Sequence, residues 1–328
     1  MKRLIVALIL TALIIGPASV LFAGGAAEET GWPSRDVRYV VPYAPGGLSD
    51  VTARMVERAV REENLLDRAF VITNIAGASA GNAMEEVVAA PPDGYLLLHH
   101  HTSFISHVAL GVRDWGYEEF TPIAMLFEVP QAAFTVPGKY ESLEEWIQYV
   151  RDNPGRTTFA GSSLGGGTHL MGEMLLEAAG IRDDLRYVAH GGGGPMTTAI
   201  LAGEDLMGLT QLPTVLSDHL SGDFEILAVS SAERVSSLPD VPTFGELGYE
   251  IPLQTSHRMG VWGPPGMSDE LVEQIAAFFE RVVQSRTFQE LAAQNGLFIR
   301  FESGEGLRRA FEQDEQIIMS LVEEFGLN

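Results

Sequence analysis

The chain has no cysteine among its 328 residues and few basic residues. The missing cysteine excludes disulfide bonds, thiolate metal sites and a lipid-modified cysteine. Lys and Arg total 21 against 44 Asp and Glu, which gives a formal net charge of -23. A nucleic-acid partner is excluded on this balance, because phosphate binding needs a basic surface. The same negative field repels anions at long range, so any anion site must depend on local amides and dipoles.

Long apolar runs are also missing after the first 27 residues. Before that point, Lys2 and Arg3 precede a nearly unbroken apolar run from Leu4 to Ile15, which ends at Gly16-Pro17 and small residues. This pattern predicts a signal peptide over residues 1–27. A membrane anchor is the alternative, but the run is shorter than the ~20 residues that a span needs. We therefore expect a periplasmic or extracytoplasmic protein, soluble after removal of the signal peptide.

No metal or nucleotide motif is present either: the sequence contains no H-E-x-x-H, no P-loop and no dinucleotide fingerprint. His99, His100 and His101 are consecutive, and neighbouring residues on a strand point to opposite faces. Three such side chains cannot converge on one ion. The sequence thus predicts no cofactor and no metal.

Short apolar runs alternate with helical patterns from Val37 onward, beginning with expected strands at 37–41, 69–73 and 95–98. This alternation predicts an α/β fold of parallel sheets covered by helices on both faces. Apolar segments near Pro130 and Ser256 read as crossings between two doubly wound domains. The expected domains are residues 28–134 with 256–328, and residues 135–255.

Three glycine-rich turns each separate an expected strand from an expected helix, at 46–47, 165–167 and 191–194. After Gly46-Gly47, Ser49 or Asp50 is the expected N-cap of the helix. Such a turn presents free backbone amides and the positive end of a helix dipole, which is a site for an anion. Each turn alone is equally explained by the steric needs of a βα connection. Three of them favour a shared cleft at the carboxyl ends of strands.

Two histidines lie next to these turns, His169 and His190. Either one could donate a hydrogen bond to a ligand carboxylate. Alternatively, either could be a structural histidine whose hydrogen bonds are made within the protein.

An enzymatic alternative comes from Gly161-Ser162-Ser163-Leu164-Gly165, which matches the G-x-S-x-G nucleophile elbow of hydrolases. An exported serine esterase would use Ser163 with Asp218 or Asp240 and His257. However, the His190-Gly191-Gly192-Gly193 run, which is similar to an oxyanion loop, follows the serine instead of preceding it. A binding protein without chemistry is therefore the preferred interpretation.

Four motifs carry a family resemblance. They are W-P-S-R-D-V-R-Y-V-V-P-Y-A-P-G-G at 32–47 with Asp50, P-D-G-Y-L-L at 92–97, L-P-D-V-P-T at 238–243 and G-P-P-G at 263–266. In these motifs and their spacing the chain resembles the Bug family, the substrate-binding receptors of tripartite tricarboxylate transporters (TTT). The resemblance covers nearly all of the exported part.

The resemblance implies a periplasmic-binding-protein type II-like (Venus flytrap) fold. Such a receptor hands a small organic acid, a mono- or dicarboxylate, to the membrane permease subunits of the transporter. It also implies a carboxylate bound by backbone amides of the first turn, partly through water, while polar residues elsewhere close over the other end of the ligand. Carried onto this chain, the first group is Gly46, Gly47, Leu48 and Ser49, and the second is Thr102, Ser103, Ser162, Ser163, Thr168 and His169.

The chain departs from the family pattern in two places. His190-Gly191 stands where the family usually has Tyr-Lys, and Thr210-Gln211 stands where an acidic residue often follows the strand. Because both changes lie toward the variable end of the ligand, His190, Gly191 and Gln211 complete the predicted ligand-binding set.

Overall fold

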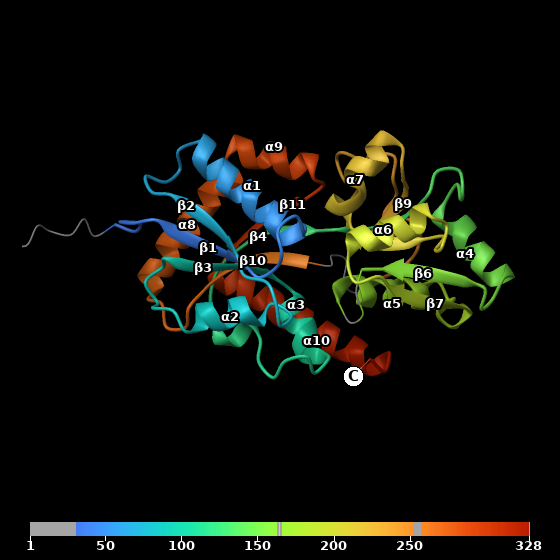
Figure 1. The fold of residues 1–328 in the computed structure, drawn as a ribbon, viewed down its shortest axis with the longest axis horizontal. Coiled ribbons are helices and arrows are strands. Elements are labelled where there is room, and N and C mark those ends of the chain that lie inside the picture. Colours follow the sequence, from blue (N-terminus) through green and yellow to red (C-terminus); the bar gives the residue numbers. More distant parts are fainter. Residues whose placement is uncertain (1–30, 163, 165, 252–256, 328) are drawn as a thin grey trace, which may run out of the picture. The chain divides into compact units, whose positions relative to one another are not determined.

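A computed structural model describes residues 31–327 of the chain, except 163, 165 and 252–256. The predicted signal peptide, Ser163 and Ser256 lie outside the described residues. The described part contains two β-sheets with helices on both faces (Figure 1). The doubly wound α/β prediction is therefore confirmed.

The first sheet has the strand order β11-β4-β10-β3-β1-β2. Its strands are β1 (Val37–Val41), β2 (Phe70–Asn74), β3 (Leu96–His101), β4 (Thr121–Val129), β10 (His257–Gly263) and β11 (Phe298–Ser303). Alternating and fully apolar runs form these strands because both faces of the sheet are covered. We call this sheet with its helices the first lobe.

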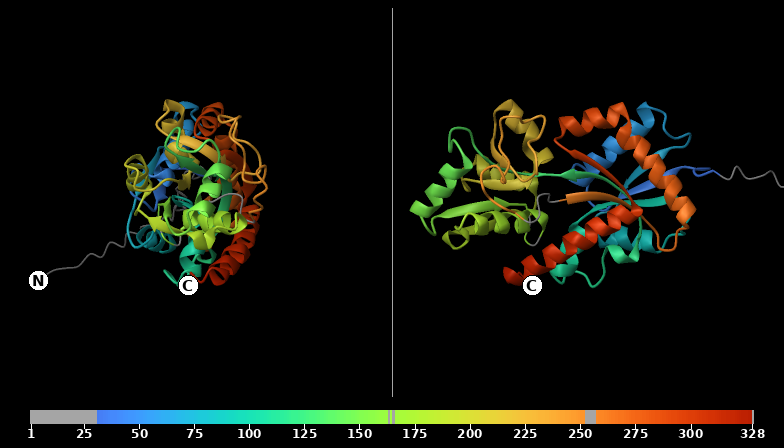
Figure 2. Two further views of the ribbon diagram at one scale, coloured as in Figure 1. Left: turned by 90° about the vertical axis from the view of Figure 1, so that its right-hand side faces the viewer. Right: turned by 180° about the vertical axis from the view of Figure 1, so that it is seen from behind.

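Helices cover both faces of the first sheet (Figures 1 and 2). One face carries α1 (Leu48–Glu62), α8 (Asp269–Gln284) and α9 (Arg286–Gln294), packed through residues such as Val56, Phe279 and Phe288. The other face carries α2 (Gly81–Val88), α3 (Ser103–Ala109) and α10 (Gly304–Glu324), with Met84, Phe104 and Phe311 in its core.

The second sheet has the order β7-β6-β8-β5-β9. Its strands are β5 (Gln131–Thr135), β6 (Thr157–Gly161), β7 (Leu185–Ala189), β8 (Gly208–Gln211) and β9 (Glu225–Val229), and its helices are α4 (Leu143–Asp152), α5 (Gly167–Ala178), α6 (Gly193–Leu201) and α7 (Leu212–Ser221). Trp146 of α4 and Leu170 of α5 belong to one buried cluster, and Met196 of α6 and Val215 of α7 to another. This sheet with its helices is the second lobe. Short 3-10 turns at Tyr117–Glu119 and Arg182–Asp184 complete the described elements.

Both sheets contain the predicted parallel strands together with antiparallel ones. Strands β2, β1 and β3 are parallel, as are β7, β6 and β8. In contrast, β10 runs antiparallel to β3 and β4, and β5 runs antiparallel to β8 and β9. Each of β5 and β10 follows a crossing between the lobes, and a chain that crosses from one sheet enters the next sheet from its carboxyl edge. Strand β11 is also antiparallel to β4.

The crossing at Pro130 is confirmed, because β4 ends in the first sheet at Val129 and β5 begins in the second at Gln131. The Pro130 carbonyl accepts a hydrogen bond from the Leu212 amide at 2.9 Å. The chain returns to the first sheet between β9 and β10. The division into domains 28–134 with 256–328, and 135–255, stays a prediction. Over the described ranges, no helix combines the length and apolar character needed to cross a bilayer.

Candidate functional site

The carboxyl edges of the two sheets meet at the crossing. In the first sheet, β1 and β3 are parallel, so the turns after Val41 and His101 share one edge. In the second, the turns after β6, β7 and β8 share an edge for the same reason. Residues on either side of Pro130 connect these edges: Val129 pairs with His257, and Gln131 pairs with Gln211. The predicted site residues of both lobes therefore converge on this junction.

The helices that open at the three glycine turns all have glycine N-caps. These are Gly47 for α1, Gly166 for α5 and Gly192 for α6, and none has a side-chain cap hydrogen bond. The expected cap at Ser49 or Asp50 is therefore wrong, because both residues lie inside the first turn of α1. Because glycine has no side-chain acceptor, the N-cap residue cannot accept a hydrogen bond from the first backbone amides of each helix through a side chain. These amides can therefore donate to another acceptor.

Those amides have no protein acceptor within the described part of the chain. They are the backbone N–H groups of Leu48 and Ser49 in α1, Gly167 and Thr168 in α5, and Gly193 and Gly194 in α6. By contrast, α4 is capped by Ser142 Oγ, which accepts from the Glu145 amide at 3.1 Å. Helix starts away from the junction can thus be capped by a side chain, while the three at the junction are open toward an anion.

The first glycine turn is held by Asp50, whose side chain is buried. Its carboxylate accepts from the Gly46 amide, Arg54 Nε and Asn74 Nδ2, each at 2.9 Å. Burial acts to raise the pKa of Asp50, but the hydrogen bonds from Arg54, Gly46 and Asn74 outweigh it and hold the pKa below its ordinary value. The Gly46 amide, predicted to contact ligand, is therefore engaged by Asp50 here, and Gly46 serves the turn through its φ of 87°.

Thr102 and Ser103 begin α3 next to this turn. The Ser103 hydroxyl lies 3.1 Å from the Tyr43 hydroxyl and 2.6 Å from His101 Nδ1. Because the Ser103 amide also donates to Nδ1, that nitrogen is the acceptor and His101 carries its proton on Nε2. The Tyr43 and His101 rings stack at 5.5 Å. Burial lowers the pKa of His101, with the neighbouring His257 as the next contribution, so this wall is uncharged at neutral pH.

His257 links this wall to the second lobe. Its ring centroid lies 4.0 Å from that of His101, and its Nε2 accepts a hydrogen bond from Gln211 Nε2 at 2.9 Å. An amide nitrogen can only donate, so the His257 proton resides on Nδ1, which lies 3.5 Å from Thr102 Oγ1. The Gln211 amide is oriented by Thr210, whose hydroxyl donates to Gln211 Oε1 at 3.2 Å. The predicted residue Gln211 thus joins residues of the first lobe directly.

The second-lobe turn after β6 adds further polar groups. Ser162 Oγ and Thr168 Oγ1 lie 2.9 Å apart, and the Gln131 side chain donates to the Gly167 carbonyl at 3.0 Å. The α6 start is also near, since a Cβ atom on Gly193 would lie 4.0 Å from Thr210 Oγ1. Ser163 lies outside the described residues. Ser162, Thr168, Gly193 and Gln211 therefore belong to one edge of the second lobe.

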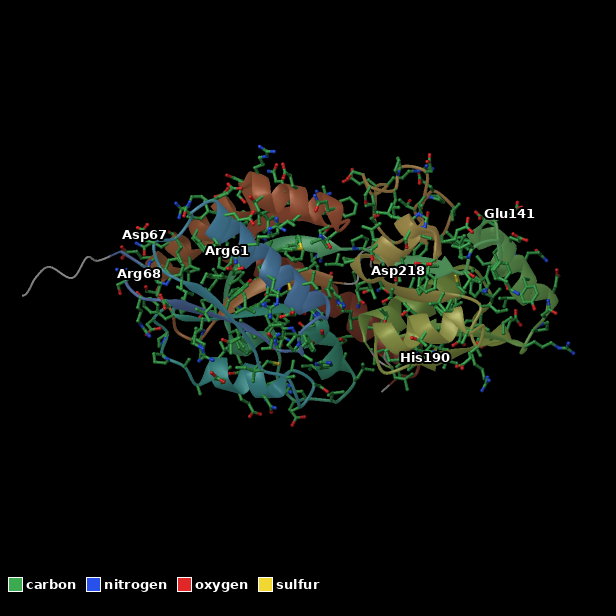
Figure 3. All side chains as sticks on the ribbon, turned by 45° about the horizontal axis from the view of Figure 1, so that its top comes forward. Arg61, Asp67, Arg68, Glu141, His190 and Asp218 are labelled. Atoms are coloured by element: carbon green, nitrogen blue, oxygen red, sulfur yellow. The ribbon has the colours of Figure 1, made fainter. Side chains whose placement is uncertain are left out.

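The two predicted histidines have protein partners. His169 Nε2 lies 3.4 Å from Glu173 Oε1, and its ring packs on Tyr187 at 4.3 Å. His190 Nε2 lies 2.6 Å from Asp205 Oδ2, while Gly191 takes the positive φ of the turn. Figure 3 labels His190 in the loop after β7. Both histidines thus have a carboxylate partner within the protein, and their contact with a ligand stays a prediction.

Sequence reasoning missed four residues of the junction: Tyr43, His101, Gln131 and His257. Tyr43 lies within the family motif, and His101 precedes the predicted Thr102. Gln131 and His257 flank the two crossings, a position that signals proximity to both lobes. Their adjacency to predicted features could have indicated them.

The hydrolase candidates are widely distributed over the fold. His257 begins β10 in the first sheet, whereas Asp218 lies on α7 (Figure 3) and Asp240 is exposed in the segment after β9. The Asp218 carboxylate accepts from Ser217 Oγ at 3.4 Å. Among the residues that the structure describes, no group of three or more His, Asp or Glu side chains could hold a metal ion.

Comparisons with known proteins agree with this architecture. Protein BugT of Bordetella pertussis is 29% identical over 270 residues, which cover 81% of each chain. The structure of periplasmic binding protein BugD aligns with a TM-score of 0.75 and 27% identity, covering 90% of this chain and 99% of that one. An R. palustris protein solved with adipate aligns with a TM-score of 0.79 and 25% identity, covering 90% and 99%.

The family model described as "Tripartite tricarboxylate transporter family receptor" matches residues 52–327. This match covers most of the chain, including both lobes and the two crossings between them. The family resemblance is thereby confirmed, and the motifs at 92–97, 238–243 and 263–266 lie within the matched residues. The chain belongs to the receptor family of the tripartite tricarboxylate transporters.

Proposed function

We propose that this protein is an extracytoplasmic solute-binding receptor, without catalytic activity, that captures a small organic carboxylate at the junction of its lobes. The observation that carries the proposal is the set of three glycine-capped helix starts whose first amides have no protein acceptor within the described residues. All three lie at the carboxyl edges that meet near Pro130.

These amides suffice to bind an anion without a lysine or arginine. A hydrogen bond to a charged acceptor contributes roughly 1.5–3 kcal/mol. A helix dipole adds roughly 0.3–1 kcal/mol, and up to ~2 kcal/mol in a partly buried site. Two or three such contacts give useful affinity even in a molecule with a net charge of -23.

The relatives support the ligand class. The R. palustris protein, which is 25% identical, was solved with adipate, a dicarboxylate. The family description names a transporter of tricarboxylates. We therefore assign a mono- or dicarboxylate to this site, and delivery of that ligand to the membrane permease subunits of a tripartite tricarboxylate transporter.

Capture requires the lobes to close over the ligand. The chain passes between the two sheets at Pro130 and again between β9 and β10. Closure would turn about the crossing at Pro130. Export by the signal peptide over residues 1–27 would place the mature protein in the periplasm or outside the membrane.

Isothermal titration calorimetry of the mature chain tests the proposal. The panel contains small monocarboxylates, dicarboxylates, aromatic acids and amino acids, with uncharged amides of the same acids as matched controls. We expect heat from at least one carboxylate and none from its amide. Absence of binding by every acid would contradict the proposal. Turnover of an ester by a serine that an active-site probe labels would favour an esterase instead.

A further inference from the structure

Gln131, the first residue of β5, has an acceptor that the protein leaves unused. Its side chain is fully buried, with 0% of its surface exposed. Its Oε1 atom is buried and has no hydrogen-bond partner among the residues that the structure describes. A buried acceptor of this kind is uncommon, because leaving it unpaired is unfavourable.

The orientation of the Gln131 amide is fixed. Its Nε2 donates to the Gly167 carbonyl at 3.0 Å, so Oε1 must be the other end. The backbone is held as well, because the Gln131 amide donates to Ser230 Oγ at 2.8 Å and its carbonyl accepts from the Ser230 amide at 2.9 Å. Gln131 therefore has no freedom to turn Oε1 toward another group.

The neighbouring polar side chain does not satisfy this acceptor either. Gln211 lies directly opposite Gln131 in the sheet. Its Oε1 accepts from Thr210 Oγ1, and its Nε2 donates to His257. Gln131 Oε1 thus lies at the junction of the lobes, beside the first turn of α5, and is an acceptor to which the described residues donate no hydrogen bond.

We infer that the ligand supplies that donor, an inference that rests on the function proposed above. A carboxylate has no proton to donate, and its oxygen would face the Gln131 oxygen with two acceptors in contact. A hydroxyl or amino group on the carbon chain of the acid would instead pair with Oε1. Opening of the lobes at Pro130, the preceding residue, would admit the ligand. The receptor therefore selects hydroxy- or amino-substituted carboxylic acids over unsubstituted ones.

Calorimetric titration with matched acids tests this selection. One set is butanedioate, 2-hydroxybutanedioate and 2-aminobutanedioate, and the other is propanoate, 2-hydroxypropanoate and 2-aminopropanoate. We expect a hydroxy or amino member to bind at least about tenfold more tightly than its unsubstituted counterpart, because the plain acid leaves Oε1 unpaired. Comparison of the hydroxy and amino arms identifies which donor is used.

The variant Gln131→Met keeps the approximate size of the side chain and removes both the Oε1 acceptor and the Nε2 donor to the Gly167 carbonyl. It should reduce the preference to within about threefold, because the substituted acid then has no Oε1 acceptor to pair with. Gln148→Met, on the exposed face of α4, is the control and should keep the full preference. Circular dichroism of each variant confirms that it is folded.

Two results would overturn this inference and leave the proposed function standing. One is equal affinity within a matched set for the unmodified chain, and the other is a preference that survives in Gln131→Met. The first comparison needs no variant, so it stands even if the substitution prevents folding. Binding of none of the six acids, nor of any other acid in the wider panel, would overturn the proposed function together with this inference.

Discussion

His99 Nε2 and Thr52 Oγ1 lie 2.9 Å apart in the buried layer between β3 and α1. The Thr52 hydroxyl donates its single proton to the Leu48 carbonyl at 2.9 Å, so it accepts from His99. The other ring nitrogen, Nδ1, is then the acceptor for the Tyr39 hydroxyl at 2.6 Å. Burial lowers the pKa of His99 to about 3, which keeps the ring neutral. This network anchors the first turn of α1, where the open amides lie.

The variant Thr52→Val should destabilise the protein by roughly 1–3 kcal/mol, because it leaves the buried His99 N–H without an acceptor. It should also weaken carboxylate binding, since the first turn of α1 loses an anchor. Urea unfolding and calorimetry measure the two effects. Thr198→Val is the matched control: Thr198 makes the same type of bond, to the Gly194 carbonyl at 3.0 Å, on an exposed face. Equal stability changes in the two variants would contradict the prediction.

The variant Leu48→Pro tests the amides themselves, because it deletes the N–H at the first position of α1. Proline is well tolerated there, and the preceding residue, Gly47, already has the extended backbone (ψ 174°) that proline requires. We expect affinity for the carboxylate to fall by about 10- to 100-fold, corresponding to one hydrogen bond to a charged group. Asp269→Pro at the first position of α8, after Ser268 with ψ 147°, is the control and should bind normally. Unchanged affinity in Leu48→Pro would exclude this amide from the site.

Much of this architecture could be predicted from the sequence. The apolar runs located the strands, and Pro130 marked the crossing because it interrupts one long β-rich segment. The glycine turns identified the edge of each sheet that faces the site. These features are local, so residue type and spacing are enough to indicate them.

Partner choice within the site could not be predicted. Nothing local shows that Asp50 takes the Gly46 amide, that His169 faces Glu173, or that His190 faces Asp205. The pairing of His169 with Glu173 depends on side-chain directions within one helix. The pairing of His190 with Asp205 joins residues 15 positions apart. Gln131 was missed for the same reason, because its unpaired oxygen is visible only once every neighbouring bond is known.

The stability of the protein should depend on Asp314, a buried residue of α10. Its carboxylate pairs with Arg258 Nη1, and Glu128 pairs with Arg258 Nε at 3.1 Å. Burial raises the pKa of Asp314 from 3.8 to about 6, although Arg258 opposes the shift. The folded chain therefore binds this proton more readily than the unfolded chain between about pH 4 and 6. Its contribution to stability is present below pH 4 and is lost as the pH rises through 6.

Urea unfolding at a series of pH values checks this prediction. Because other groups also titrate, the informative quantity is the difference between the unmodified chain and Asp314→Asn. As the pH falls from 6 to 4, the unmodified chain should gain stability relative to the variant, by at most about 1.4 kcal/mol per pH unit. A difference that is constant across this range would show that Asp314 does not titrate there.

Arg182 should couple the second lobe to the end of α10 in the first. Its Nε donates to Glu173 Oε2 at 2.5 Å, and its Nη2 donates to the Phe325 carbonyl at 3.1 Å. The guanidinium carbon also lies 4.5 Å from the centre of the Phe325 ring. The variant Arg182→Met removes all three contacts and leaves the buried Glu173 carboxylate with one fewer donor. We expect a loss of about 1–3 kcal/mol of unfolding free energy, below the usual range for a fully buried pair because Arg182 is partly exposed.

A double-mutant cycle separates the two partners of Arg182. The loss of unfolding free energy in Arg182→Met can arise because the buried Glu173 carboxylate no longer has its Arg182 donor. In that case, adding Glu173→Gln to Arg182→Met should recover part of the lost stability. Phe325→Ala keeps the pairing of Arg182 with Glu173 and the bond to the Phe325 carbonyl, but it removes the ring that lies against Arg182 and belongs to a buried cluster. This variant should lower stability, because it truncates a buried ring, and it should also change ligand affinity, because the ring packs where the lobes meet. Identical affinity and stability in Phe325→Ala and the unmodified chain would show that the end of α10 has no part in closure.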